Sequence, residues 1–324
     1  MVAKVWSLPA AVAVLVCLSA FSSGAVTGQV RPWGYNGWNQ VKYPPAGQDF
    51  IATAAGFNND MAIRADGTLV TWGSDVYGVV SNSPAGNDFI GVAGGKNFSL
   101  ALHADGTVTG WGDPSYGETT PPARLTGVTA LAAGNSHGLA LKSDGTVVAW
   151  GYDYDRQADV PTGLNNVVAI AAGEYHSLAL RADGTVAAWG WNTYGECNIP
   201  QDLHFKSIAG GEAFTVGVLD DGSIRLFGND LNGITVVPPG NDFQTVWAGS
   251  YFILAQKADG AIVPFGRNDY GEFNVPSGEF GMISCKGLGG IALNVPEPAS
   301  VALMLLGGAA VLGRRRARRV ERRA

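Results

Sequence analysis

The sequence predicts an all-β fold, a β-propeller of seven blades, from three regular observations. An Asp-Gly pair recurs at a step of 38 or 39 residues, an aromatic residue followed by Gly stands five residues after each of these glycines, and another Gly stands eleven residues before. Repeats of about 40 residues with several short strands are typical of propeller blades. The six pairs begin at Asp66, Asp105, Asp144, Asp183, Asp221 and Asp259.

Each repeat is a run of short strands, as residues 128–161 illustrate. "VTALAAG" and "HGLALKS" concentrate apolar residues over segments too short for a helical pattern. We expect Asp-Gly to form a two-residue hairpin turn with positive φ angles, which returns the chain antiparallel as "TVVAWG". A fourth, weaker strand should run into Pro161 at the outer edge. The repeated Trp should lie between blades, and the repeated Gly should allow close approach near the axis.

The first repeat lacks its first half. Gly28 and Trp33 keep the five-residue step, and Trp33 precedes Trp72 by 39 residues, so this segment supplies the later strands of a blade. At the other end, residues 282–294 repeat only a first half, with Gly287 falling 38 after Gly249. We therefore predict that the two fragments form one blade and close a ring of seven over residues 27–294. This clasp covers edges that would otherwise be unpaired.

The N-terminal segment has the order of a secretory signal peptide. Lys4 is followed by an apolar run from Leu8 to Phe21 and by the small residues Ser23-Gly24-Ala25. We predict a signal peptide over residues 1–25, and therefore export through the inner membrane.

The C-terminal segment, residues 295–324, resembles a PEP-CTERM sorting signal. Its Pro-Glu-Pro motif precedes the short apolar block 299–313, expected to be helical, and a basic cluster. The residues that carry the motif are Pro296, Glu297, Pro298, Arg314, Arg315 and Arg316. The resemblance implies an exosortase-type enzyme as partner, transient membrane contact, and transfer to the cell surface or outside it after processing. The alternative is an ordinary membrane anchor, although the block is shorter than the roughly 20 residues a bilayer needs.

The charge of the central region argues against nucleic acid as partner. Without Lys4 and seven C-terminal Arg, 13 of 21 basic residues remain, and without Glu297 and Glu321, 25 of 27 acidic residues remain, for a net charge near −12. Such a body repels phosphate backbones. Cys197 and Cys285 are too few for a disulfide framework, and we expect small buried thiols.

Residues 176–196, "HSLALRADGTVAAWGWNTYGE", resemble the repeat of the regulator of chromosome condensation family. The resemblance extends over residues 27–294 and implies a seven-bladed binding ring without naming its ligand. The family's eukaryotic founder acts on a small GTPase and on chromatin, roles that the acidic body and the export signals contradict. The repeat length and the "YGETTPP" style of loop are closer to a secreted bacterial propeller that inhibits β-lactamase with one rim.

Candidate catalytic and metal-binding residues are few. His137 and His176 share a repeat position held elsewhere by Asn59, Phe98, Phe214, Phe252 and Gly290, which indicates a packing position. His103 and His204 have no partners at ligand spacing. The Asp-Gly aspartates are turn formers in separate blades, unlike a calcium loop. We therefore expect no enzyme, no metal and no cofactor.

Variable repeat positions should carry the function, because the scaffold uses the recurrent ones. Mainly aromatic residues follow each Trp-Gly at one spacing, with Glu two residues later. If exposed, they form a rim that binds protein or glycan; alternatively, the aromatics pack between blades and the Glu side chains bond the loop backbone. The candidate rim comprises Trp38, Tyr77, Tyr116, Tyr194, Tyr270, Glu118, Glu196 and Glu272.

Together these features predict an exported, monomeric, non-enzymatic propeller that binds a surface protein or polysaccharide through one rim. The alternatives are a purely structural surface protein and a secreted inhibitor of a hydrolase resembling the β-lactamase-inhibitor propeller. A surface hydrolase or lyase is less favoured. Loss of such an activity on replacing His137 or His176 would overturn the non-enzymatic interpretation.

Overall fold

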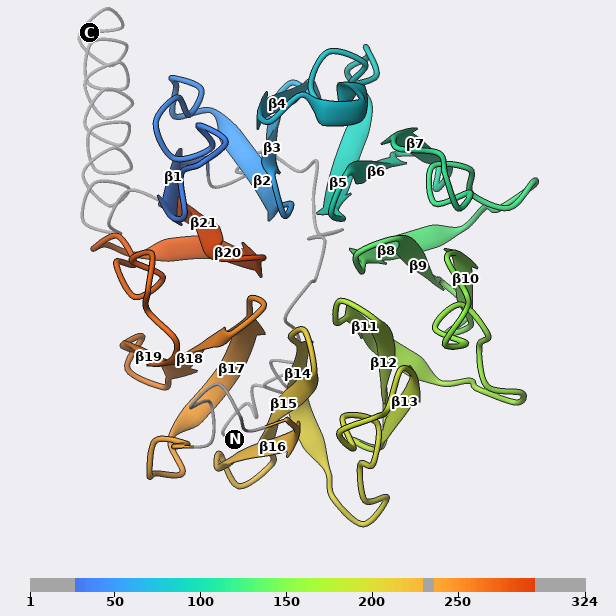
Figure 1. Cartoon of the computed structure of the whole chain (residues 1–324), viewed down its shortest axis with the longest axis vertical. Coiled ribbons are helices and arrows are strands. Elements are labelled where there is room, and N and C mark those ends of the chain that lie inside the picture. The colour runs from blue at the N-terminus through green and yellow to red at the C-terminus, as the bar shows by residue number, and fades with distance from the viewer. Residues whose placement is uncertain (1–26, 230–235, 295–324) are drawn as a thin grey trace, which may run out of the picture.

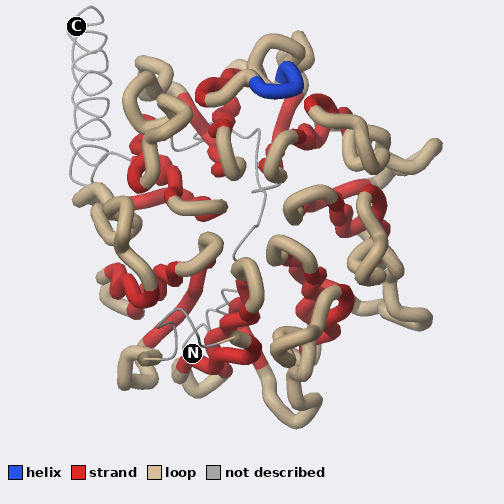
Figure 2. The backbone as a smooth tube through the Cα atoms, in the orientation of Figure 1, coloured by secondary structure: helices blue, strands red, loops and turns tan. Residues whose placement is uncertain are grey.

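Seven three-stranded antiparallel sheets surround a central axis in the computed structural model, which describes residues 27–229 and 236–294 (Figures 1 and 2). The only helix in this part of the chain is a three-residue 3₁₀ turn, η1 (Val76–Gly78). The prediction of an all-β, seven-bladed propeller is confirmed. The predicted signal peptide, residues 1–25, and the sorting segment, residues 295–324, lie outside the described residues.

Each blade has an inner, a middle and an outer strand. Blades 1 to 3 are β2 (Phe50–Ala55), β3 (Asn59–Arg64) and β4 (Leu69–Gly73); β5 (Phe89–Gly94), β6 (Phe98–His103) and β7 (Val108–Gly112); and β8 (Val128–Ala133), β9 (His137–Lys142) and β10 (Val147–Gly151). Blades 4 to 6 are β11 (Val167–Ala172), β12 (His176–Arg181) and β13 (Val186–Gly190); β14 (Phe205–Gly210), β15 (Phe214–Leu219) and β16 (Ile224–Gly228); and β17 (Phe243–Ala248), β18 (Phe252–Lys257) and β19 (Ile262–Gly266). Blade 7 is β20 (Phe280–Lys286), β21 (Gly289–Asn294) and β1 (Gln29–Gly34).

The prediction of a fourth strand in each blade is wrong. Within the described residues, every blade has three strands. After the outer strand the chain enters a loop whose backbone N–H groups bond a side chain instead of a neighbouring strand. Asp75 Oδ1 accepts from Val80 and Ser81 at 2.9 and 2.8 Å. Asn192 Oδ1 accepts from Cys197 at 2.9 Å in the corresponding loop of blade 4. Short polar side chains that bond nearby backbone compete with sheet pairing, so this segment forms a turn.

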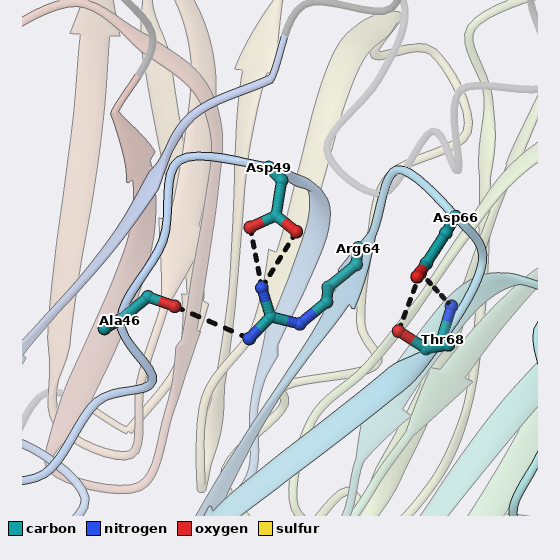
Figure 3. Close-up of polar contacts among 5 residues, drawn as sticks. All are labelled: Ala46, Asp49, Arg64, Asp66 and Thr68. Atoms are coloured by element: carbon teal, nitrogen blue, oxygen red, sulfur yellow. Dashed lines mark hydrogen bonds and ion pairs between the residues drawn. The ribbon is translucent and has the colours of Figure 1, made fainter.

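The Asp-Gly turn also differs from the expected two-residue form. Gly67 has a φ of +82°, whereas Asp66 is not among the residues with positive φ. Gly67 N donates to Arg64 O, and Arg64 N donates to Thr68 O, both at 2.9 Å, which defines a three-residue loop ending in a left-handed glycine. Asp66 Oδ1 accepts from both N and Oγ1 of Thr68 (Figure 3). The aspartate therefore fixes the turn through its side chain and not through its backbone angles.

The predicted clasp is confirmed. Strand β1 pairs antiparallel with β21 from Gln29 opposite Asn294 to Gly34 opposite Gly289, and the blue β1 lies beside the red β21 in Figure 1. All strands of the described residues, including both halves of the clasp, fall within residues 28–294, so the ring closes within this stretch. It has no open blade for which a further strand would be needed.

One register detail of blade 7 differs from expectation. Gly289, not Gly290, occupies the packing position of His137, because Gly289 pairs with Gly34 just as His137 pairs with Gly151. Lys286 consequently takes the place of the repeated glycine. In blade 3, a Cβ on the repeated Gly134 would lie 2.0 Å from a ring carbon of His137. A side chain fits at residue 286 because Gly289 carries no ring.

The repeated tryptophans lie between blades, as predicted. Trp111 is buried against Ala52 and Ile63 of blade 1. Its indole Nε1 donates to Val79 O at 2.9 Å, in the loop that follows the outer strand of blade 1. The same bond joins Trp33 to Glu272, Trp72 to Gln40, Trp150 to Glu118 and Trp189 to Gln157. Each indole therefore couples the packing of one blade to the loop of the preceding one.

Replacing Trp33 by Ala tests the contribution of the clasp to the ring. Trp33 is buried and bonds Glu272 O across the junction of blades 6 and 7, whereas Trp38 in the same N-terminal segment is exposed. We expect W33A to lower the free energy of unfolding by about 3–5 kcal/mol in urea titrations. W38A is the matched control and should change it by less than about 0.5 kcal/mol. Equal losses in the two variants would contradict the clasp.

Candidate functional site

The propeller has two unlike faces. One face carries the turns between inner and middle strands together with the loops that follow the outer strands, and we call it the turn face. Backbone bonds join these two sets: Trp191 N donates to Tyr175 O at 3.0 Å and Tyr152 N donates to Ser136 O at 2.8 Å. The opposite face carries the Asp-Gly turns. Variable residues gather on the turn face, while the Asp-Gly face repeats the same turn chemistry.

The five candidate rim aromatics are exposed on the turn face. Trp38, Tyr77, Tyr116, Tyr194 and Tyr270 expose between 41% and 55% of their surface. The alternative that these side chains pack between blades is therefore wrong. The corresponding Asp155 is half-buried, and the corresponding residue of blade 5, Asn232, lies outside the described residues.

The three candidate glutamates do not belong to this exposed surface, which corrects their placement at the rim. Glu118, Glu196 and Glu272 are buried, and each accepts a backbone N–H from the rim tyrosine two residues earlier at 2.7–2.9 Å. The backbone oxygens of Glu118 and Glu272 accept the indole bonds of the next blades. Burial raises the pKa of Glu118 and Glu196. These side chains fix the loops that present the tyrosines.

The variants E118Q and E118A test whether the Glu118 side chain stabilises its loop through this hydrogen bond. Gln40 and Gln157 make the same bond with Oε1 in their own loops, so E118Q keeps the acceptor while E118A removes it. We expect E118A to lower the free energy of unfolding by about 1–3 kcal/mol and E118Q to leave it nearly unchanged at pH 7. Urea titrations of both variants and the wild type measure the difference.

The stability difference between E118Q and the wild type should depend on pH, and the direction follows from the raised pKa of Glu118. Because folding raises the pKa of Glu118, its ionised form is disfavoured in the folded state, and the wild type gains stability as pH falls through that pKa. E118Q has no such group, so its stability relative to the wild type should decrease as pH is lowered from 7 towards 4.5. A constant difference over this interval would show that residue 118 is solvated.

Four further aromatic residues that the repeat spacing did not predict, on blades 3 and 4, lie next to the rim. Tyr116 packs edge-on against Tyr152 at a centroid distance of 4.8 Å, and Tyr152 stacks with Tyr154 at 6.4 Å. On blade 4, Trp191 packs edge-on against Tyr175 at 5.7 Å and against Tyr194 at 5.4 Å. We call this set the aromatic strip: Tyr116, Tyr152, Tyr154, Tyr175, Trp191 and Tyr194. Variation directly after each Trp-Gly pair was the sequence signal for Tyr152 and Trp191.

Carboxylates border the aromatic strip. The pKa of Tyr152 is raised by burial and by the negative charge of Asp155. Burial also raises the pKa of Tyr175, with Glu174, Glu212 and Tyr152 adding to the rise and a hydrogen bond to Asn135 opposing it. Tyr152 and Tyr175 belong to neighbouring blades, 3 and 4, and both lie on the turn face. The strip is therefore an aromatic surface with the carboxylates of Asp155 and Glu174 beside it in the sequence.

Polar groups from several blades form hydrogen bonds with one another near the propeller axis, on the turn face. Lys286 Nζ donates to Ala133 O at 2.8 Å, joining blade 7 to blade 3. Glu174 of blade 4 accepts bonds from Ser250 of blade 6 and from Asn135 Nδ2 at 2.7 Å. Burial lowers the pKa of Lys286 to about 8, and the charge of Glu174 opposes this shift. We call these five residues the axial network, and it ties together blades that are not neighbours.

His137 and His176 are buried packing residues with one polar contact each. Ser177 Oγ donates to Gln157 O, so it accepts from Nε2–H of His137 at 3.1 Å, and Nδ1 of His137 is left unprotonated. His176 Nε2 lies 2.9 Å from Thr215 Oγ1. Burial, with the nearby Lys286 charge, lowers the pKa of each histidine to about 3. Both imidazoles are neutral near pH 7 and lack an exposed face for substrate.

The remaining histidines and cysteines serve local structure. His103 lies 2.9 Å from Asp88 and 2.8 Å from Thr109, and His204 Nδ1 lies 2.7 Å from Asp183 O. Cys197 and Cys285 are free thiols, half-buried rather than fully buried. Burial raises the pKa of Cys197 to about 12. Within residues 27–229 and 236–294, no three His, Cys, Asp or Glu side chains are grouped as metal ligands.

The sequence contains matches to two known families. Residues 89–118, 128–157 and 167–196 match the regulator of chromosome condensation (RCC1) repeat, and residues 294–319 match the PEP-CTERM protein-sorting motif. The three matched repeats end at the buried Glu118, Gln157 and Glu196, in the loops of blades 2, 3 and 4. No curated protein matches the sequence.

Solved structures share the fold at low sequence identity. Prp20p from Saccharomyces cerevisiae is 17% identical with a TM-score of 0.70, covering 89% of this chain and 96% of its own. Human WBSCR16 is 18% identical with a TM-score of 0.67, covering 83% and 99%. The ectodomain of the Physcomitrella patens receptor kinase CR4 is 25% identical with a TM-score of 0.62, covering 72% and 67%. These likenesses establish the RCC1-type propeller architecture.

The described residues contain no helix that is long and apolar enough to span a membrane. The sorting motif at residues 294–319 indicates a protein that is exported and then anchored in the membrane or sorted to the surface.

Proposed function

We propose that this chain, with its RCC1 repeats and PEP-CTERM sorting motif, is an exported, non-enzymatic binding protein whose turn face holds a macromolecular partner. The observation that carries the proposal is the aromatic strip. Six aromatic side chains from three consecutive blades lie there in two contacting groups of three, Tyr116–Tyr152–Tyr154 and Tyr175–Trp191–Tyr194, and Tyr116, Tyr154 and Tyr194 are exposed. Tyr and Trp supply large contact areas at low entropic cost and dominate binding hot spots.

The position of the C-terminal segment supports the turn face as the binding face. Asn294, the last residue of β21, pairs with Gln29, and Gly28 bonds Phe50 at the start of the inner strand of blade 1. These residues lie at the Asp-Gly face, as does Gly67, which makes the equivalent bond to Phe89. Asn294, the last described residue before the sorting segment, therefore lies at the face opposite the strip. A propeller held through this segment, by a sorting enzyme or in a membrane, keeps its turn face free.

The candidate partners are a protein or a polysaccharide of the cell envelope. We propose an exosortase-type enzyme as a second partner that acts on the tail and not on the ring. Inhibition of a hydrolase is one form that protein binding through the turn face would take. The buried histidines of the ring serve packing, and the exposed part of the turn face is aromatic, so the proposal assigns it binding and not chemistry.

Capture from native envelope extract tests the proposal. Immobilised residues 26–294 should retain a partner that Y154A and W191A variants lose by about tenfold or more, because each substitution removes a ring of the strip. Tyr43, exposed by 61% outside the strip, provides the matched control, and Y43A should retain the partner fully.

Circular dichroism and urea titration of each variant check that the ring is still folded. Tyr154 exposes 83% of its surface, so its replacement should leave the ring intact. Equal capture by wild type, Y154A and W191A would contradict binding through the strip. Capture that depends instead on residues of the Asp-Gly turns would assign the function to the opposite face.

A further inference from the structure

Elsewhere on the propeller, aromatic rings are covered by basic side chains of the chain itself. Five such contacts occur in the described residues, with the cation 4.6–5.7 Å from the ring centroid. They pair Lys42 with Tyr43, Arg64 with Phe50, Lys96 with Phe57, Lys257 with Phe243 and Arg267 with Tyr251. Cation–π contacts of this kind are attractive, and more so when the pair is shielded from water.

Blade 6 shows what such a contact looks like on the turn face. Arg267 lies 5.0 Å over the ring of Tyr251, and its backbone N donates to Tyr251 O at 2.9 Å. Its guanidinium also bonds Asp269. A nearby Glu212 bonds the Tyr251 hydroxyl. The site thus combines an aromatic face, a neighbouring carboxylate and a guanidinium.

Blade 4 has the same arrangement without the cation. Trp191 N donates to Tyr175 O at 3.0 Å, so Tyr175 and Trp191 occupy the positions of Tyr251 and Arg267. None of the six rings of the aromatic strip carries a Lys or Arg in the described structure, although Asp155 and Glu174 border it. The strip has aromatic faces with carboxylates beside them, and in the described structure no cation lies over its rings as Arg267 lies over Tyr251 on blade 6, although the exposed Arg156 follows Asp155 in the same loop.

We infer that the partner supplies this basic group, and that the aromatic strip binds a polypeptide segment bearing exposed arginine or lysine. The inference rests on the proposed function and specifies its partner. Guanidinium groups stack on aromatic rings and pair with carboxylates such as Asp155 at the same time. The net charge near −12 of the central region steers a basic partner towards the protein and repels an acidic one.

The composition of the loops favours a polypeptide over a sugar chain as occupant. The strip loops read "GDPSYGE", "GYDYDRQ" and "GWNTYGE", in which Tyr, Trp, Ser, Gly and Asn surround the carboxylates. The same residue types dominate protein-binding loops of antibodies, where rigid aromatic anchors are combined with adaptable polar contacts. Buried Glu118 and Glu196 hold two of these loops in place, so the anchors are preorganised.

Synthetic peptides test the inference directly. Residues 26–294 are titrated by calorimetry and by tryptophan fluorescence with a peptide of alternating arginine and serine, and with counterparts in which citrulline, lysine or glutamate replaces arginine. We expect the arginine peptide to bind most tightly, the lysine peptide more weakly, and the citrulline and glutamate peptides at least about tenfold more weakly. Binding should weaken as salt rises.

Variants assign the binding to the strip. Y154A and W191A should each raise the dissociation constant of the arginine peptide about tenfold, and D155N should reduce its salt dependence. Y43A is the matched control, because Lys42 already covers that ring, and it should bind as the wild type does. Y154A alters a side chain that is 83% exposed, so a folding defect does not confound the result.

Three outcomes would overturn the inference: no binding of the arginine peptide, equal binding of the citrulline peptide, or binding only of neutral glucose or glucosamine oligomers. The proposed function has a separate test. If envelope capture is lost in Y154A and W191A while the arginine peptide neither binds nor competes, the turn face binds a partner of different chemistry. The binding role then stands and the basic-partner inference falls.

Discussion

The structure depends on the contact between neighbouring blades, because no single sheet of three strands buries its own faces. The repeated indole makes this contact specific. Trp111 packs against Ala52 and Ile63 of the preceding blade and also bonds the Val79 carbonyl in that blade's loop. Such contacts satisfy every blade only if the ring is closed. Closure therefore requires that residues 29–34 and 280–294, from opposite ends of the propeller, form one sheet.

Ring closure also explains why the variable residues gather on one face. A Glu or Gln at one position of the outer loop is used twice in four blades: its carbonyl accepts the indole bond of the next blade, and its side chain accepts a backbone N–H of its own loop. These residues are Gln40, Glu118, Gln157 and Glu272. Because this contact is the same in most blades, the residues around it are free to differ. Blade 4 uses that freedom to place Trp191 between two tyrosines, and blade 6 places Arg267 at the same position.

The repeat period determines much of the fold before any coordinates are known. Asp-Gly, Trp-Gly and the repeated Gly predict seven blades, and the half-repeats at Trp33 and Gly287 predict the clasp. The fourth strand was wrong because Asp75 and Asn192 bond backbone groups that a sheet would need, a competition that apolar periodicity does not reveal. The register of blade 7 differs by one residue from the expected one. Lys286 stands at the position of the repeated glycine, and Gly289 stands at the position of the packing residue.

The candidate site was predictable only in part. The exposed rim tyrosines follow from repeat spacing, whereas the burial of Glu118, Glu196 and Glu272 follows from a hydrogen bond within each loop. Tyr152 and Trp191 come together with the rim through blade geometry that the linear sequence does not contain. The axial network is likewise formed by residues as distant as Ala133 and Lys286.

Hydrogen-exchange mass spectrometry of the protein with its captured envelope partner tests the central claim, that the turn face of blades 2 to 4 is the binding face. The account predicts slower exchange on binding in the loops at residues 113–118, 152–157 and 191–196, with the Asp-Gly turns unchanged. Slower exchange at the Asp-Gly turns, with those three loops unaffected, would contradict it.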